Sequence, residues 1–152
     1  MAIEQDPKVF LEWLKAEIPL LNHMGIEKLN FNGESLTMAA ALSPNVNDKG
    51  TGFGGSLATL ATISGWSLTT LLLRERGLNC DVMIRDCQLN FQAPVTDDFI
   101  AKVSVPSELE VEGFLARLAE KGKARLGLNI AILQSEQSKL LMAANYVAVA
   151  RT

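Results

Sequence analysis

Residues 45–77 have the sequence NVNDKGTGFGGSLATLATISGWSLTTLLLRERG, in which a polar loop and a glycine-rich turn lead into one long apolar segment. Residues 57–73 contain neither a charge nor a proline, which predicts a helix with Ser56 as its N-cap and Gly77 just beyond its end. Apolar side chains occur on every side of this helix, so it has no face suited to water. We therefore expect the rest of the chain to enclose it.

A membrane span is the first alternative, because ~17 to 25 apolar residues are enough to cross a bilayer. The segment carries several Ser and Thr hydroxyls, and it has neither a second span nor an asymmetry of basic flanking residues. A core helix is the better interpretation. We expect no membrane partner.

The length of 152 residues predicts one domain, residues 1–152, with an N-terminal helix in residues 1–20 and the main core in residues 21–152. Charged residues make up 20% of the chain and the net charge is −3. These values give no electrostatic basis for binding nucleic acid.

The chain has two cysteines, Cys80 and Cys87, and one histidine, His23. They do not form a recognisable metal motif, so we expect no metal site and interpret the cysteines as packing residues. The first residues lack the basic and apolar regions of a signal peptide. A cytoplasmic protein with reduced thiols is the corresponding prediction.

The segments on either side of the long helix alternate between apolar and polar residues, as strands do. Asp6 opens an N-terminal helix, Asn32-Gly33 marks a hairpin, and Ser107 starts a short connecting helix. The predicted strands are residues 25–31, 35–42, 82–92, 99–105, 124–132 and 140–150. This order predicts an α+β fold, an antiparallel sheet of about six strands wrapped around one long central helix.

Two catalytic motifs come close to matching the glycine-rich turn. Residues 50–55 satisfy the G-x-G-x-x-G pattern of dinucleotide sites, but the βαβ context is missing. Residues 54–58 approach the nucleophile elbow, with Ser56 as nucleophile, but His23 lies upstream in another connection. Both are weaker interpretations than a turn that brings the backbone close to a ligand.

A glycine turn that enters a helix leaves backbone N–H groups free at the positive end of the helix dipole. Here these groups belong to Gly54, Gly55 and Ser56. Asn47 can add a side-chain donor and Phe53 an apolar wall. The pattern predicts an oxyanion hole for a polarised carbonyl, such as that of a thioester.

Motifs in the loop, the long helix and the following strand together resemble one family of enzymes. The stretch Asn47-x-x-Gly50-x-x-Phe53-Gly54-Gly55, a long helix rich in small residues, and a strand ending in Phe91-Gln92-Ala93-Pro94-Val95 resemble the hotdog-fold acyl-thioester enzymes. Pro44-Asn45-x-Asn47, Phe53-Gly54-Gly55-Ser56 and Gly65-Trp66 resemble the thioesterase domain at the C-terminus of YiiD-type proteins, which also occurs as a free-standing chain. The resemblance spans roughly residues 19–150, so the motifs occur within the strands and helix expected around them.

The resemblance implies a homodimer, possibly a dimer of dimers, whose sheets join edge to edge and whose active sites lie at the interface. It implies CoA or acyl carrier protein (ACP) thioesters as substrates, with phosphopantetheine as part of the substrate and no separate cofactor. Lys121, Lys123 and Arg125 are candidates for phosphate contacts, although a solvated basic face also explains them.

The sequence departs from other hotdog thioesterases at two positions. Those enzymes usually place His before the Gly-Gly pair and an acid about nine residues later, whereas this chain has Phe53 and Thr62. The usual base that activates water is missing, and Asp48 is the only local substitute. Decarboxylation of a malonyl thioester needs no such base, because an oxyanion hole can carry the enolate charge.

Malonyl-ACP or malonyl-CoA decarboxylation to the acetyl thioester, a step associated with initiation of fatty acid synthesis in such members, is therefore the preferred prediction. Thioester hydrolysis and a non-catalytic module that binds acyl carriers stay open as alternatives. In either reaction Asn47 polarises or orients the acyl group beside the backbone donors. The predicted substrate-binding residues are Asn45, Asp48, Phe53, Thr59, Thr62 and Trp66, with Trp66 closing the pocket.

Overall fold

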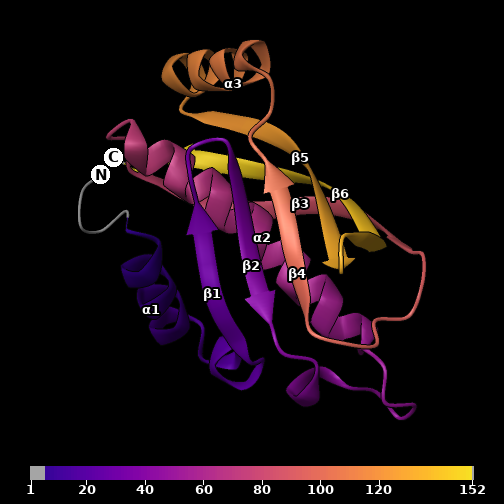
Figure 1. Cartoon of the computed structure of the whole chain (residues 1–152). Helices are drawn as coiled ribbons and strands as arrows, with labels where there is room; N and C mark the ends of the chain where they lie inside the picture. Colours follow the sequence, from indigo (N-terminus) through magenta and orange to yellow (C-terminus); the bar gives the residue numbers. More distant parts are fainter. Residues whose placement is uncertain (1–5, 152) are drawn as a thin grey trace.

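The computed structural model describes residues 6–151. Its six strands form one antiparallel sheet in the order β1-β2-β4-β5-β6-β3, which curls around α2 (Figure 1). The elements in chain order are α1 (Pro7–Glu17), η2 (Pro19–His23), β1 (Ile26–Phe31), β2 (Ser35–Ala40), η3 (Ser43–Asn45), α2 (Gly54–Glu75), β3 (Cys80–Phe91), β4 (Phe99–Ser104), α3 (Glu108–Lys121), β5 (Lys123–Gln134) and β6 (Gln137–Ala150). The predicted α+β architecture is confirmed, and the first five residues of the predicted segment 1–20 lie outside the described residues.

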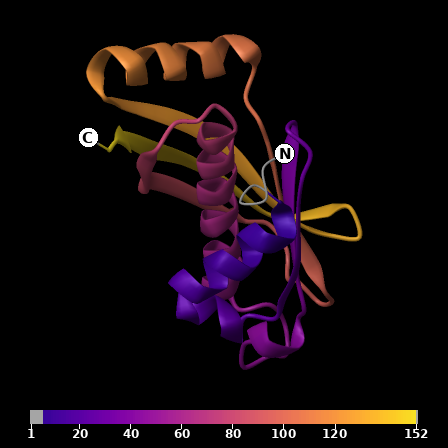
Figure 2. The ribbon, with the colours of Figure 1, turned by 90° about the vertical axis from the view of Figure 1, so that its left-hand side faces the viewer.

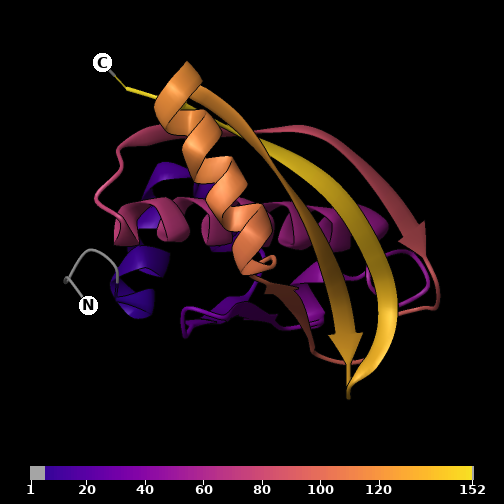
Figure 3. The ribbon, with the colours of Figure 1, turned by 90° about the horizontal axis from the view of Figure 1, so that it is seen from above.

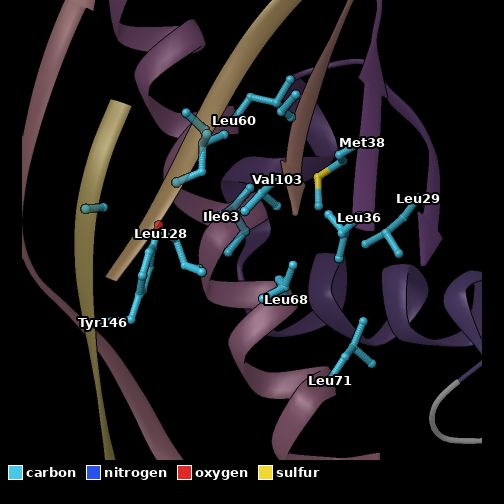
Figure 4. Packing of buried hydrophobic residues seen from close by; sticks show 14 of the residues in the cluster. Leu29, Leu36, Met38, Leu60, Ile63, Leu68, Leu71, Val103, Leu128 and Tyr146 are labelled. Carbon is cyan, nitrogen blue, oxygen red and sulfur yellow. The ribbon is translucent and has the colours of Figure 1, made fainter. Parts of the chain in front are cut away.

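The core lies between α2 and the inner face of the sheet. Strand residues alternate, so every second side chain of β2, β4, β5 and β6 points to α2 and is buried. Figure 4 shows Leu60, Leu68 and Leu71 of α2 packed among such side chains. By length and composition α2 could cross a membrane, but 67% of its apolar window is buried inside the protein, as in a core helix.

α2 begins three residues earlier than predicted, at Gly54 and not at Leu57. Its N-cap is Phe53, which makes no side-chain cap hydrogen bond, and Ser56 lies inside the first turn. The prediction of Ser56 as N-cap is therefore wrong. The N–H of Phe53 instead donates to the carbonyl of Asn45 at 2.7 Å, so the backbone of the preceding loop sets the start of the helix.

α1 lies against α2 and β1 (Figure 2). The carboxylate of Asp6 accepts from the N–H of Lys8 at 2.9 Å, which confirms the predicted start of this helix. Phe10 and Leu14 are fully buried. α1 thus covers a part of α2 that the sheet leaves open.

The turns differ in detail from the sequence pattern. Asn32 accepts from the N–H groups of Glu34 and Ser35, so Gly33 and Glu34, not Asn32-Gly33, form the turn between β1 and β2. α3 is a full helix and not a short connector, because Ser107 caps it and exposed Gly113 does not interrupt it.

Tyr146 of β6 crosses α2 where the helix carries Gly65. Its hydroxyl donates to the carbonyl of Thr62 at 2.7 Å, and a Cβ on Gly65 would overlap that hydroxyl. Burial raises the pKa of Tyr146, which keeps the hydroxyl protonated as a donor. This contact fixes the rotation of α2 over the sheet.

We predict that Gly65→Ala lowers the free energy of unfolding by at least about 2 kcal/mol, because the added methyl displaces Tyr146 from a filled core. Gly113→Ala is the matched control. Its Cβ meets nothing within 4 Å, so it should raise stability by about 0.5 to 1 kcal/mol. Urea unfolding of both variants measures the difference, and equal stabilities would contradict the proposed contact.

Candidate functional site

The loop before α2 is organised by Asn45. This side chain is 2% exposed, and its amide donates to the carbonyls of Met24 at 2.7 Å and Ala41 at 2.8 Å. The backbone carbonyl of Asn45 accepts from the N–H of Phe53. Both amide hydrogens are thus used inside the protein. The prediction that Asn45 binds substrate is corrected: it fixes the loop to the end of β2.

Asn47 closes the next turn of the same loop. Its side-chain oxygen accepts from the N–H groups of Lys49 and Thr51, and its amide donates to the hydroxyl of Thr51 at 2.8 Å. A primary amide has two N–H donors, and among the described residues the second one has no partner. Asn47 is therefore held in place while one N–H stays available to a ligand.

Three consecutive backbone N–H groups begin α2 without acceptors. The first bond within the helix runs from Leu57 to the carbonyl of Phe53 at 3.1 Å. The N–H groups of Gly54, Gly55 and Ser56 precede it, and no acceptor for them occurs among residues 6–151. They point out of the positive end of a 22-residue helix. Such a terminus binds an anion or a polarised carbonyl oxygen.

Two phenylalanine rings flank these N–H groups. A Cβ on Gly55 would lie 2.5 Å from the Phe53 ring, and one on Gly54 would lie 3.2 Å from the Phe91 ring. Both rings are 54% exposed. The glycines therefore let two apolar side chains approach the first turn. Phe91 belongs to the motif that carries the family resemblance but is absent from the predicted site residues, and its place at the end of β3 brings it beside Gly54.

The three helix residues predicted to shape the pocket lie on one face of α2, because they are spaced by three and four positions. Thr59 donates to the carbonyl of Gly55 at 2.8 Å, and Thr62 contacts the sulfur of Met142 at 3.9 Å. Trp66 lies about three turns from Gly55. Its side chain is half-buried and belongs to an aromatic cluster with α1, so it does not border the carbonyl site itself.

Acid–base groups near the first turn are few. Asp48 is 81% exposed and pairs with Lys49 at 3.0 Å, and His23 is exposed in η2. The helix position nine residues after Phe53 holds Thr62 and not an acid. A general base needs fixed geometry, which an exposed loop carboxylate does not have.

The predicted basic cluster does not join this site within one chain. Lys121 ends α3 beside Glu120, and Lys123 and Arg125 alternate with buried inward residues, so they point to the outer face of the sheet. Phe91 is aligned through β6 with Ile132. Lys123 is nine residues from Ile132 along β5, which is roughly 30 Å. Within one chain these residues therefore lie far from the first turn of α2, and their contact with a carrier phosphate stays a prediction.

A family model described as "Putative thioesterase (yiiD_Cterm)" matches residues 8–150. The chain belongs to this family. The resemblance inferred from the loop and helix is thereby confirmed, and membership in the YiiD C-terminal family supports an enzyme that acts on thioesters.

Solved structures agree with this assignment. A protein of unknown function from Chlorobaculum tepidum is 27% identical, with 99% of this chain and 100% of that chain covered and a TM-score of 0.87. A "putative thioesterase" from Shewanella oneidensis is 27% identical, with 91% and 93% covered and a TM-score of 0.81. A thioesterase from Haemophilus influenzae, at 17% identity, 92% and 88% coverage and a TM-score of 0.70, shares the fold. The chain has the hotdog fold of this family.

We predict that Asn45→Ala lowers the free energy of unfolding by about 2 to 4 kcal/mol, because it removes the side-chain donor from one buried and one partly buried carbonyl. Asn22→Ala is the matched control, since Asn22 also donates to two carbonyls but is exposed. It should cost less than about 1 kcal/mol. Chemical unfolding compares the two, and an Asn45→Ala variant as stable as the control would contradict the structural role.

Proposed function

We propose that this member of the YiiD C-terminal family is an enzyme that acts on acyl thioesters of CoA or ACP and decarboxylates a malonyl thioester to the acetyl thioester. The observation that carries the proposal is the set of unpartnered N–H groups of Gly54, Gly55 and Ser56 beside two phenyl rings, with no fixed acid or base among the described residues around them. The thioester carbonyl oxygen binds these N–H groups.

The reaction follows from where charge develops. The bond between the malonyl carboxylate and the α-carbon breaks, CO₂ leaves, and the electron pair passes into an enolate whose oxygen carries the negative charge. Backbone N–H groups aimed at that oxygen stabilise it most strongly in the transition state. Water then supplies one proton to the α-carbon, which gives the acetyl thioester.

The side chains around the first turn suit this step. The rings of Phe53 and Phe91 offer the acyl group an apolar surface beside the backbone donors. The free N–H of Asn47 is a further donor to the carbonyl oxygen. Thr59 lies one turn further along the helix and borders the acyl group.

Hydrolysis is the alternative reaction, and it needs a base that deprotonates water. Asp48 is the local candidate, but its carboxylate is exposed and paired with Lys49. Hydrolysis therefore ranks second in our proposal, and a module that only binds acyl carriers ranks third.

We propose a homodimer formed through the free edge of β3. This strand ends the sheet, is 12 residues long and exposes the apolar side chain of Met83 on its outer face. Long exposed edges of this kind favour pairing with another strand. A dimer of dimers and a cytoplasmic location stay predictions.

The proposed reaction is tested by incubating the purified chain with malonyl-ACP, with malonyl-CoA and with a panel of saturated acyl-CoA thioesters, while CO₂ and free thiol are measured separately. We expect CO₂ and acetyl thioester in equal amounts without free thiol. Free thiol without CO₂ would show that the enzyme hydrolyses the thioester and would reject decarboxylation. Neither product, combined with measurable binding of the carrier, would support the non-catalytic module.

A further inference from the structure

β3 approaches α2 at two places that lie far apart along the strand. At one end the indole N–H of Trp66 donates to the carbonyl of Val82 at 2.7 Å. At the other end the ring of Phe91 lies beside Gly54, 3.2 Å from the position of a Cβ. The edge strand is therefore tied to the helix near Trp66 and again at the first turn.

The two paths between these places differ in length. Twelve residues of helix from Gly54 to Trp66 span about 18 Å, whereas nine residues of strand from Val82 to Phe91 span about 30 Å. The strand must bow between its two contacts, and β3 is strongly curved (Figure 3). A register shift between Ile84 and Asp86 adds to the bend.

The side chains on the inner face of the bowed part of β3 point toward α2, but several of them stay exposed. Ile84, Cys87, Leu89 and Phe91 pair with β6 residues that are buried on the inner face, so they point to the same side. Yet Ile84 is 38% exposed and Cys87 is also exposed.

Thr59 and Thr62 are half-exposed on the facing side of α2. We call Thr59, Thr62, Ile84, Cys87, Leu89 and Phe91 the α2–β3 strip. It starts beside the N–H groups of the first turn.

Trp66 closes the far end of the strip. Its indole reaches across from the helix to the backbone of β3, and the ring is stacked on Trp13 at 6.2 Å between centroids and 18° between planes. Phe10 lies behind both rings. Beneath the strip the core is filled, since Leu60 and Tyr146 are fully buried. A ligand that enters at the first turn can extend along the strip only as far as Trp66.

We propose that the strip holds the alkyl part of the acyl group and that Trp66 sets the longest acyl chain the site accepts. This inference rests on the proposed binding of the thioester carbonyl at the first turn of α2. A malonyl group fills only the start of the strip, so Trp66 acts as an upper limit and the same site admits longer saturated chains.

The test measures binding of non-reactive S-alkyl-CoA thioethers, from ethyl to hexadecyl, to the full chain by calorimetry. Each methylene buried along the strip should tighten binding about fourfold, until the chain reaches Trp66 and the gain stops. In Trp66→Leu the gain should continue to longer chains. In Thr62→Phe, which places a ring in the middle of the strip, it should stop at shorter chains.

Trp13→Leu is the control, because it removes the stacking partner but keeps the bond from Trp66 to Val82, so the limit should stay at the wild-type length. If Trp66→Leu does not fold, Thr62→Phe decides. The same length limit in wild type and Thr62→Phe, or no dependence on length, would overturn the inference. Thioether binding involves no turnover, so the two proposals can fail separately. A length limit without CO₂ release would reject only the proposed decarboxylation. CO₂ release without a length limit would reject only the role of Trp66.

Discussion

The structure depends on the need to remove α2 from water. A helix with no charge over most of its length has no face that tolerates solvent, so the sheet must curl around it and α1 must cover a part that the sheet leaves open. Tyr146 against Gly65 then fixes the rotation of the helix over β6. With its rotation fixed, α2 presents its first turn, its last residues and one narrow face, which includes Thr59 and Thr62, to the outside.

That arrangement makes the first turn chemically useful. Its N–H groups cannot find acceptors because a helix begins there, and the loop that precedes it uses its own polar groups internally. The side chain of Asn45 holds the loop, that of Asn47 keeps one donor free, and two exposed phenyl rings flank the first turn. The resulting site has donors for a negative oxygen and no fixed base, which matches a reaction that creates an enolate better than one that activates water.

Much of the fold was predictable from the sequence, since the alternation of strand residues and the charge-free run around Leu60 are local signals. The site was predictable only in part. Ser56 fits a cap preference, but a backbone bond from Phe53 to Asn45 starts the helix earlier. Asn45 and Trp66 match a family pattern, but the pattern does not reveal that their side chains donate to backbone carbonyls of the same chain. Phe91 belongs to the motif that carries the family resemblance, but its contact with Gly54 could not be inferred from the sequence, because that contact depends on the curvature of β3.

In the proposed reaction, the backbone N–H groups of the first turn stabilise the negative charge on the enolate oxygen. The most direct measurement is the ratio of kcat for malonyl-thioester decarboxylation between Gly54→Pro and Gly54→Ala. Proline is accepted at the first helical position, and Phe53 before it already has the extended conformation, with ψ of 128°, that proline requires. Both variants keep the start of the helix, but proline replaces the N–H by a ring carbon and so removes this donor. Loss of that donor should lower kcat by about 10²-fold or more relative to Gly54→Ala, whereas equal kcat values in two folded variants would contradict the account.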